Sequence, residues 1–457
     1  MKIIILGANP VGINIAETLS GEANDITIID SDNEKLRILK DHMDIGVITG
    51  YPSHPDILEK AGGADADMII AVTESDETNM VACRVAFSLF QTAKKICRIR
   101  SSSYLVSDKL FGKKGIAVDV VISPEIIVSQ AISRLLSLPG SLQVLDFAEG
   151  KVQLVAVKAF YGGPLVGQQL RLLKEHMPSV DTRVAAIFRK DRPIMPEGTT
   201  VIEAGDEVFF VAAKEDIRAC MSELRRMDRP YKRVMIAGGG NIGLRLAESI
   251  EDEYKVKIIE RDADRCRFLS ENLNSAIVLN GEASEHDLLI NENIDDIDVF
   301  LALTNDDEDN IMSSLLAKRL GAKKVMTIIN NPDYVDLLQG GEIDIAISPQ
   351  QAITGSLLTH VRRGDVVNVH SLRRGAAESI EAIAHGDITS SRVVGRAIRE
   401  IDLPEGTTIG AIVRGEEVLI AHDSTVVESD DHVILFLVDS KRIPEVERLF
   451  QVGFGFF

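Results

Sequence analysis

The sequence predicts an α/β protein with two Rossmann-like, doubly wound parallel-sheet domains, each followed by a small α+β domain. Three observations predict this architecture. Short apolar runs of strand length alternate with segments of helical period, which is typical of a parallel sheet covered on both faces. A glycine-rich turn joins the first strand to the first helix, as in dinucleotide-binding sheets. The same arrangement then occurs a second time, with glycine turns at 7–12 and 238–243.

The composition is that of an ordinary multidomain globular protein. The chain has 457 residues, too many for one hydrophobic core, and its apolar and charged shares are 45% and 26%. Without a long apolar run, and with a strand at its N-terminus, we expect neither a membrane span nor a secretory signal. The net charge of −20 argues against partners such as nucleic acid and against direct binding to anionic lipid. The cysteines at 83, 97, 220 and 266 lack metal-binding spacing, so we expect reduced thiols and no metal site.

The first Rossmann-like domain is expected over residues 1–123. Its strands are predicted, with a weaker one near Val47, at 3–6, 26–29, 68–72, 96–99 and 118–122. Segments of helical period, such as Asn79–Phe90, lie between them. The second domain of this kind is expected over residues 232–348.

Smaller units follow each Rossmann-like domain, and they contain no glycine-rich phosphate turn. They are expected over residues 141–227 and 366–453, and a charged linker near 225–232 separates the two halves. An amphipathic helix is predicted at 124–138, with proline at its first position. We expect its apolar face, which includes Ile127 and Leu135, to drive oligomerisation.

The second glycine turn has all three glycines of a dinucleotide-binding turn and reads Gly238, Gly239, Gly240, Asn241, Ile242, Gly243. The first glycine makes a tight turn, the third in this run lets the backbone approach a pyrophosphate, and the last lets the helix pack on the strand. The helix N-terminus then offers backbone N–H groups to an anion. Glu260 ends the next apolar run, where a ribose-binding carboxylate is expected. We expect this carboxylate to disfavour a 2′-phosphate, with Arg261 weakening that preference.

The first turn departs from this pattern and reads Gly7, Ala8, Asn9, Pro10, Val11, Gly12. Asn9 stands where the middle glycine is expected, and its side chain crowds the pyrophosphate position. Pro10 removes one N–H donor. Asp30 ends the second strand and keeps the position of the ribose-binding carboxylate. A turn retained only for tight packing is the alternative here.

Three further groups of residues follow or end strands near these turns. Thr73 and Thr304 follow the fourth strand of each domain, in the crevice where ligands of this architecture bind. The acidic run at 306–309 is better explained by helix capping than by a divalent metal. Arg98 and Arg100 alternate along the fifth strand, so we expect both on one face. Surface carboxylates and a phosphate in the crevice are equally good partners for them.

The two halves match segment by segment and resemble a known family. "AVTESDETNM" corresponds to "ALTNDDEDNI", "VISPE" at 121–125 to "AISPQ" at 346–350, and "GPLVGQQL" to "SRVVGRAI". The glycine turn, the acidic strand end, the T-x-x-D-x-x-N segment and the appended small domain resemble RCK (KTN) domains, which regulate potassium conductance. The tandem arrangement resembles the cytosolic RCK subunits of bacterial Trk potassium-uptake systems.

This resemblance implies a homotetramer that forms a ring of RCK units beneath a TrkH- or TrkG-type potassium-translocating membrane subunit. The protein would be peripheral, on the cytoplasmic face of the bacterial inner membrane. NAD+, NADH, ATP and ADP are the ligands implied for the two clefts. By family position the first site would use residues 7–11 with Asp30, Thr73, Glu74 and Arg98, and the second would use residues 239–243 with Glu260 and Glu282.

Two other classes of function compete with this one. A tandem NAD-dependent oxidoreductase needs an acid, base or nucleophile beside the nicotinamide. His176, His370 and His385 have no counterpart in the other half, so no catalytic group is duplicated. A purely structural scaffold does not explain why acidic residues end the second strand of both halves. The sequence therefore favours a binding protein that is not an enzyme.

Overall fold

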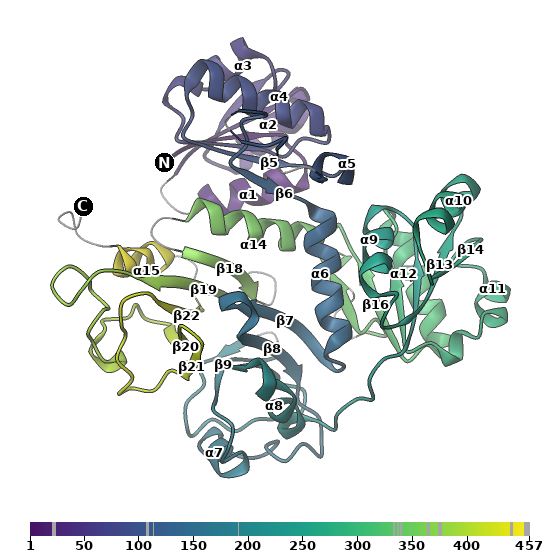
Figure 1. Cartoon of the computed structure of the whole chain (residues 1–457), viewed down its shortest axis with the longest axis vertical. Coiled ribbons are helices and arrows are strands. Elements are labelled where there is room, and N and C mark those ends of the chain that lie inside the picture. Colours follow the sequence, from purple (N-terminus) through teal and green to yellow (C-terminus); the bar gives the residue numbers. More distant parts are fainter. Residues whose placement is uncertain are drawn as a thin grey trace. The chain divides into compact units, whose positions relative to one another are not determined.

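The computed structural model describes residues 1–20, 24–106, 109–112, 114–190, 192–331, 334–335, 338, 341–362, 366–372, 377–438 and 442–451 (Figure 1). The chain forms two compact units, Met1–Ile127 with Gln350–Val361 and Val128–Pro349 with Arg362–Phe457. The predicted small domain at 366–453 includes residues 373–376, 439–441 and 452–453, which lie outside the described residues.

The first unit contains a parallel six-stranded sheet with the order β3-β2-β1-β4-β5-β6. Its central strands are apolar and buried except for Lys2 at the start of β1, because helices cover both faces of such a sheet. The order changes direction between β1 and β4, which opens the ligand crevice of a doubly wound sheet. The predicted fold class is therefore confirmed. The strands are β1 (Lys2–Leu6), β2 (Asp25–Asp30), β3 (Gly46–Thr49), β4 (Met68–Ala71), β5 (Lys94–Arg98) and β6 (Val120–Ile122).

Short helices connect these strands. They are α1 (Pro10–Ser20), α2 (Asn33–His42), α3 (Pro55–Lys60), α4 (Asp76–Val85) and α5 (Ser102–Leu105). Ser75 caps α4 by accepting a hydrogen bond from the Thr78 N–H at 3.1 Å. A π-helical turn at Ala86–Phe90 continues α4, so the predicted helix ends where expected but begins three residues earlier.

The helix α14 (Pro349–Val361) follows the second Rossmann-like domain in sequence, yet from Gln350 onward it belongs to the first unit. The Thr354 hydroxyl donates a 2.8 Å hydrogen bond to the amide oxygen of Asn14 on α1. The Lys94 ammonium group donates to the carbonyl oxygen of His360. The first sheet is therefore completed by a helix from the second half of the chain.

The second unit repeats the sheet, in the order β14-β13-β12-β15-β16-β17. The strands are β12 (Arg233–Ala237), β13 (Lys255–Glu260), β14 (Ile277–Asn280), β15 (Val299–Ala302), β16 (Lys324–Ile328) and β17 (Ile345–Ile347). The helices are α9 (Asn241–Ile250), α10 (Ala263–Asn272), α11 (His286–Asn291) and α12 (Asp307–Arg319). Asp306 caps α12 through the Asp309 N–H at 2.8 Å, so the acidic run acts as the predicted helix cap.

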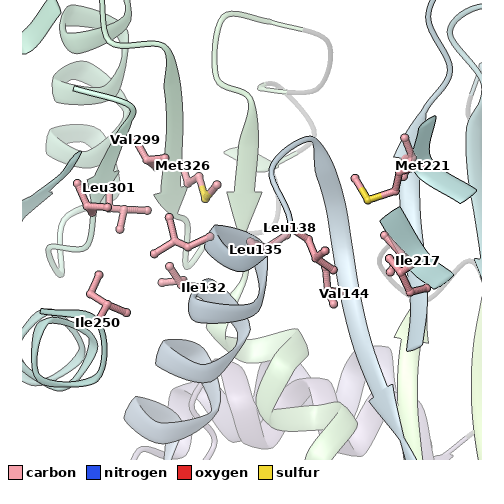
Figure 2. Packing of buried hydrophobic residues seen from close by; sticks show 14 of the residues in the cluster. Ile132, Leu135, Leu138, Val144, Ile217, Met221, Ile250, Val299, Leu301 and Met326 are labelled. Carbon is pink, nitrogen blue, oxygen red and sulfur yellow. The ribbon is translucent and has the colours of Figure 1, made fainter. Parts of the chain in front are cut away.

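The helix α6 (Pro124–Ser137) makes the reciprocal connection, because from Val128 onward it belongs to the second unit. Its apolar side packs into the core of the second sheet, and Figure 2 shows Ile132 and Leu135 facing Val299, Leu301 and Met326. Leu138, in the same core, continues toward Val144 and the small domain. The expectation that Leu135 drives oligomerisation is wrong, because this side chain is buried within one chain. Ile127 is only partly buried, so a role for it in oligomerisation stays a prediction.

The small domains are antiparallel sheets in the orders β10-β9-β11-β8-β7 and β18-β19-β22-β20-β21. Their inner faces share one apolar core, in which Phe147 and Phe209 accompany Leu372 and Phe436. The strands of the first are β7 (Ser141–Phe147), β8 (Val152–Lys158), β9 (Thr182–Arg189), β10 (Arg192–Ile194) and β11 (Glu207–Ala213), with helices α7 (Leu173–His176) and α8 (Ile217–Leu224). Those of the second are β18 (Val366–Leu372), β19 (Ala377–Ala384), β20 (Thr407–Arg414), β21 (Glu417–Ile420) and β22 (Asp431–Leu437), with α15 (Ile443–Phe450).

Candidate functional site

The two glycine turns have nearly the same backbone. Gly7 and Gly238 have φ values of +109° and +105°, a conformation that favours glycine. A Cβ atom on Gly12 or Gly243 would lie 2.0 Å from the carbonyl oxygen of the first glycine of its turn. Both turns therefore need glycine at their first and last positions for steric reasons alone.

The acidic residue that ends the second strand of each sheet holds the turn. The Asp30 carboxylate accepts hydrogen bonds from the N–H groups of Ala8 at 2.6 Å and Asp32 at 2.9 Å. The Glu260 carboxylate likewise accepts from Gly239 at 2.8 Å and Asp262 at 2.9 Å. Each carboxylate oxygen retains a lone pair for a further donor, such as a ribose hydroxyl. The two predicted ribose-binding residues therefore lie against their glycine turns.

The second turn presents open N–H donors. Gly240 precedes α9 and supplies no capping side chain, and the first intrahelical bond runs from the Leu244 N–H to the Gly240 carbonyl at 2.9 Å. Within the described chain, the N–H groups of residues 241–243 have no acceptor. A Cβ atom on Gly240 would meet nothing within 4 Å, so there is open space at this point. Such a helix terminus suits an anion.

The first turn has the same shape but is closed by a side chain. The amide oxygen of Asn9 accepts hydrogen bonds from the N–H groups of Val11 at 3.1 Å and Gly12 at 3.0 Å. The amide nitrogen donates to the carbonyl oxygen of Val72, at the end of β4, at 2.5 Å. Pro10 begins α1 and has no N–H. The donors that face outward in the second turn are therefore absent or already bonded in the first.

Thr73 and Thr304 belong to a matched network at the ends of β4 and β15. The N–H and hydroxyl of Thr73 both donate to the amide oxygen of Asn79, at 2.9 and 2.6 Å. The Asn79 amide nitrogen donates in turn to the carbonyl of Arg98 at 3.0 Å. Thr304 and Asn310 repeat these bonds. The T-x-x-D-x-x-N segment thus ties the two strands that border the crevice.

Arg98 ends β5 with a half-buried side chain. Within the described residues, its Nε has no hydrogen-bond partner although it is buried. Burial lowers the pKa of this guanidinium, and the neighbouring charge of Arg100 lowers it further. A buried donor without a partner costs about 1–3 kcal/mol, and a phosphate oxygen would satisfy it.

Arg100 lies beyond the strand, which corrects the expectation that it alternates with Arg98 along β5. The chain leaves the strand because the Asp76 carboxylate binds the N–H groups of Arg100 at 3.0 Å and Ser101 at 2.9 Å. The Arg100 side chain then reaches to within 3.5 Å of Glu125. Burial raises the pKa of the Glu125 carboxyl. Glu125 was not singled out from the sequence, although it follows Pro124 in one of the matched segments.

The second crevice carries different residues at these positions. Thr327 and Ile329 stand where the first crevice has arginines, and both are buried. Glu282 lies beyond the end of β14 and is exposed, as is Glu74 beside Thr73. The cation at the second turn is Arg265, whose Nε donates to the Gly239 carbonyl at 2.7 Å. This contact was missed because an arginine in a first helical turn has no distinctive sequence signal.

The candidate catalytic residues of an oxidoreductase do not come together. His176 pairs with Glu223 at 2.8 Å, and His385 lies 3.0 Å from Asp430. His370 is partly buried and lies edge-on to the Phe147 ring, at 5.2 Å between ring centroids. Among the residues that the structure describes, no three metal-ligating side chains form a group that could hold an ion. In the same part of the chain, no helix is long and apolar enough to cross a membrane.

Comparisons with known proteins agree with the repeated architecture. The TrkA-N domain model matches residues 3–124 and 234–349, and the TrkA-C domain model matches 154–225 and 388–451. The chain is 65% identical to the Trk system potassium uptake protein TrkA of Halomonas elongata, covering 100% of both chains. It is 62% identical to the protein of the same name from Vibrio alginolyticus, covering 99% of both.

Solved structures with this fold include three from GsuK. The GsuK RCK domain has a TM-score of 0.61 at 17% identity, covering 98% of this chain and 95% of that one. The GsuK channel bound to NAD has a TM-score of 0.61 at 18% identity, covering 98% and 79%. GsuK bound to ADP has a TM-score of 0.50 at 17% identity, covering 79% and 70%. At these identities the likeness concerns the fold.

Proposed function

The chain belongs to the family of Trk system potassium uptake proteins TrkA, and we propose that it is the nucleotide-binding cytosolic ring that gates a potassium-translocating membrane subunit. Membership places the chain among transport proteins rather than enzymes. The observation that carries the proposal is the duplicated unit of glycine turn and acidic strand end, formed at Gly7 with Asp30 and at Gly238 with Glu260. A duplicated binding site without a duplicated catalytic group suits a sensor.

The ligands we propose are NAD+ or NADH and ATP or ADP. Two supporting observations come from structures of GsuK, which has the same fold: one is bound to NAD and the other to ADP. In this chain the open turn at residues 239–243 with Glu260 suits a bridged diphosphate and its ribose. In the first site, Asp30 suits the ribose, while Arg98 and Arg100 suit a terminal phosphate.

We propose that four further residues, Thr73, Thr304, Glu74 and Glu282, also contact the nucleotides. Thr73 and Thr304 would contact a ligand in the crevice through backbone groups, because their hydroxyls already donate hydrogen bonds to asparagine side chains. Glu74 and Glu282 are exposed at strand ends, where a ribose hydroxyl could reach them. The four-domain division at 1–123, 141–227, 232–348 and 366–453 also remains our proposal.

We propose a homotetramer assembled through the outer faces of α4 and α12. Val81 and Met312 occupy the same position in the two repeats, and both are exposed, at 50% and 61%. An apolar residue exposed at matched positions suits a contact between repeats of neighbouring chains.

The ring would then bind a TrkH- or TrkG-type pore from the cytoplasmic face of the inner membrane. The acidic net charge of −20 makes a protein partner more suitable than anionic lipid.

Gating requires that a nucleotide bind one conformation of the ring more tightly than another. A coupling free energy of about 1–3 kcal/mol, the usual range, changes the open population several-fold. The network that joins Thr73, Asn79 and the end of β5 offers a rigid connection from the crevice to the sheet.

Potassium flux tests this function directly. The purified chain is reconstituted with the membrane subunit in vesicles, and flux is measured while ATP, ADP and NADH are exchanged. We expect flux to change with the nucleotide, and to lose that dependence when the membrane subunit is present alone. Equal flux with every nucleotide and without any would contradict a gating role.

A further inference from the structure

We propose that the side chain of Asn9 occupies the pyrophosphate position of the first site and thereby sets which nucleotides that site accepts. This inference rests on the proposed function, because it concerns the same nucleotide site. It assigns to Asn9 the role of an internal occupant that a ligand must displace.

The contacts of Asn9 are those of an anion held by a helix N-terminus. Its amide oxygen receives the N–H groups of Val11 and Gly12 at 3.1 and 3.0 Å, which are the donors that a phosphate oxygen would use. Its amide nitrogen is anchored on the opposite side by the Val72 carbonyl at 2.5 Å. The amide is thus held at both ends, between the turn and the end of β4.

The backbone does not require this arrangement, as the second turn demonstrates. Gly240 stands at the position of Asn9 and carries no side chain, yet Gly238 and Gly7 have almost the same φ. The helix that follows Gly240 begins without a side-chain cap. One fold therefore holds one closed turn and one open turn, and the two turns differ in the Asn9 side chain and in Pro10, which lacks an N–H.

Displacement of the Asn9 side chain by a ligand lowers the affinity of the first site by different amounts for different nucleotides. A phosphate at the first turn must break the hydrogen bonds of Asn9 to the turn before it can form its own, and Pro10 supplies no further donor. The bridged diphosphate of NADH depends on the N–H groups of the turn for its binding. The affinity of the first site is therefore reduced most for this kind of ligand. A nucleotide with a terminal phosphate retains the guanidinium group of Arg98, whose buried Nε has no partner among the described residues. Asn9 therefore makes the first site selective for terminal phosphates.

Reciprocal variants test this inference in the full-length protein. Asn9→Gly opens the first turn, Gly240→Asn closes the second, and the double variant exchanges the two. A Cβ at Gly240 meets nothing within 4 Å and the φ of −61° suits asparagine, so the second substitution fits the fold. Calorimetry with NADH counts the tight sites per chain and measures their affinities, and thermal unfolding checks that each variant is folded.

We expect one tight NADH site in the wild-type chain, two in Asn9→Gly, none in Gly240→Asn and one in the double variant. The loss of one charge-assisted contact typically changes affinity about tenfold. Each substitution should therefore change the NADH affinity of the site that carries it by about that factor. ATP affinity of the first site should change less than NADH affinity. Asn9→Gly removes a helix cap and should lower stability slightly while it tightens binding. A purely structural role for Asn9 would move both quantities in the same direction.

Two results would overturn the inference, and they are distinguishable. If Gly240→Asn weakens NADH binding while Asn9→Gly leaves the first site unchanged, nucleotide binding stands and the role of Asn9 is wrong. If no variant and no wild-type chain binds any of these nucleotides, the proposed function fails and this inference fails with it.

Discussion

The carboxylate of Glu260 accepts a 2.8 Å hydrogen bond from the backbone N–H of Gly239. The residue that would read the ribose and the turn that would hold the phosphates are therefore one bonded unit. Asp30 and Ala8 form the same relationship at 2.6 Å in the first repeat. In the proposed binding mode, a ligand with negative charge at the ribose 2′ position would lie against this carboxylate.

We predict that NADPH binds about tenfold or more weakly than NADH, because a 2′-phosphate is repelled by the carboxylate. Glu260→Gln should weaken NADH binding at the second site and reduce the difference in affinity between NADH and NADPH. Calorimetry on the full-length chain measures both affinities. Glu248→Gln, an exposed substitution on α9, is the matched control and should change neither. Equal affinities of the wild-type chain for NADH and NADPH would exclude the ribose-carboxylate assignment.

Arg98→Ala should weaken ATP binding at the first site at least about tenfold and affect NADH less. The buried Nε of Arg98 has no partner among the described residues, and a charge-assisted hydrogen bond is worth about 1.5–3 kcal/mol. Lys60→Ala removes an exposed cation from the same repeat and serves as the control. An unchanged response of potassium flux to ATP in Arg98→Ala would show that ATP acts elsewhere.

Asp206→Ala should destabilise the first small domain by about 3 kcal/mol. The Asp206 carboxylate is buried and accepts two 2.8 Å hydrogen bonds from Arg189, and a third from the Glu203 N–H. Glu203→Gln, at the exposed end of the same cluster, should cost less than about 1 kcal/mol. Thermal and denaturant unfolding measure both. Asp431 and Arg414 repeat the pair in the second small domain, so Asp431→Ala should behave like Asp206→Ala.

Stability should fall as the pH is lowered from about 6.5 toward 4, in part because of His370. Burial, the largest cause, and the nearby charge of Arg134 lower the pKa of its imidazole to about 4 from 6.5. Between these values the unfolded chain binds a proton that the folded chain does not, so unfolding is favoured as pH falls. Between pH 7.5 and pH 5, His370 should lower the free energy of unfolding by about 2 kcal/mol.

His370→Phe should reduce that pH dependence, because phenylalanine keeps the packing against Phe147 and cannot titrate. Unfolding midpoints at pH 7.5 and pH 5 measure the change. His42→Gln, at an exposed position at the end of α2, is the control. If the unfolding midpoint of His370→Phe differs between pH 7.5 and pH 5 as much as that of the wild-type chain, other groups cause the pH dependence.

Val81→Asp combined with Met312→Asp should dissociate the tetramer without unfolding the chain. A charge placed on an exposed apolar position is tolerated by the folded monomer, but it is costly in a buried interface. Light scattering gives the mass of the assembly. Ile290→Asp is the control, since Ile290 is exposed on α11 and Glu59 occupies the matching position of the first repeat. A wild-type mass for the double variant, or a monomeric wild-type chain, would exclude this assembly surface.

Local pattern in the sequence was sufficient to predict the two parallel sheets, their repeat and the acidic residues beside the glycine turns. The alternation of apolar runs with helical segments determines which faces must be buried, and glycines at 7, 12, 238 and 243 are required by sterics within one turn. These features depend on neighbours a few residues away, so they can be read along the chain.

Tertiary structure alone decided which surfaces those elements cover. The helix at 124–138 is amphipathic in sequence, but only the fold shows that Leu135 packs on the second sheet while α14 completes the first unit. Likewise Asn9 was recognised as a substitution in the turn, but the partners of its amide lie partly at Val72, at the end of another strand. Hydrogen-bond partners and covered faces depend on groups far apart in sequence, and only folding brings these together.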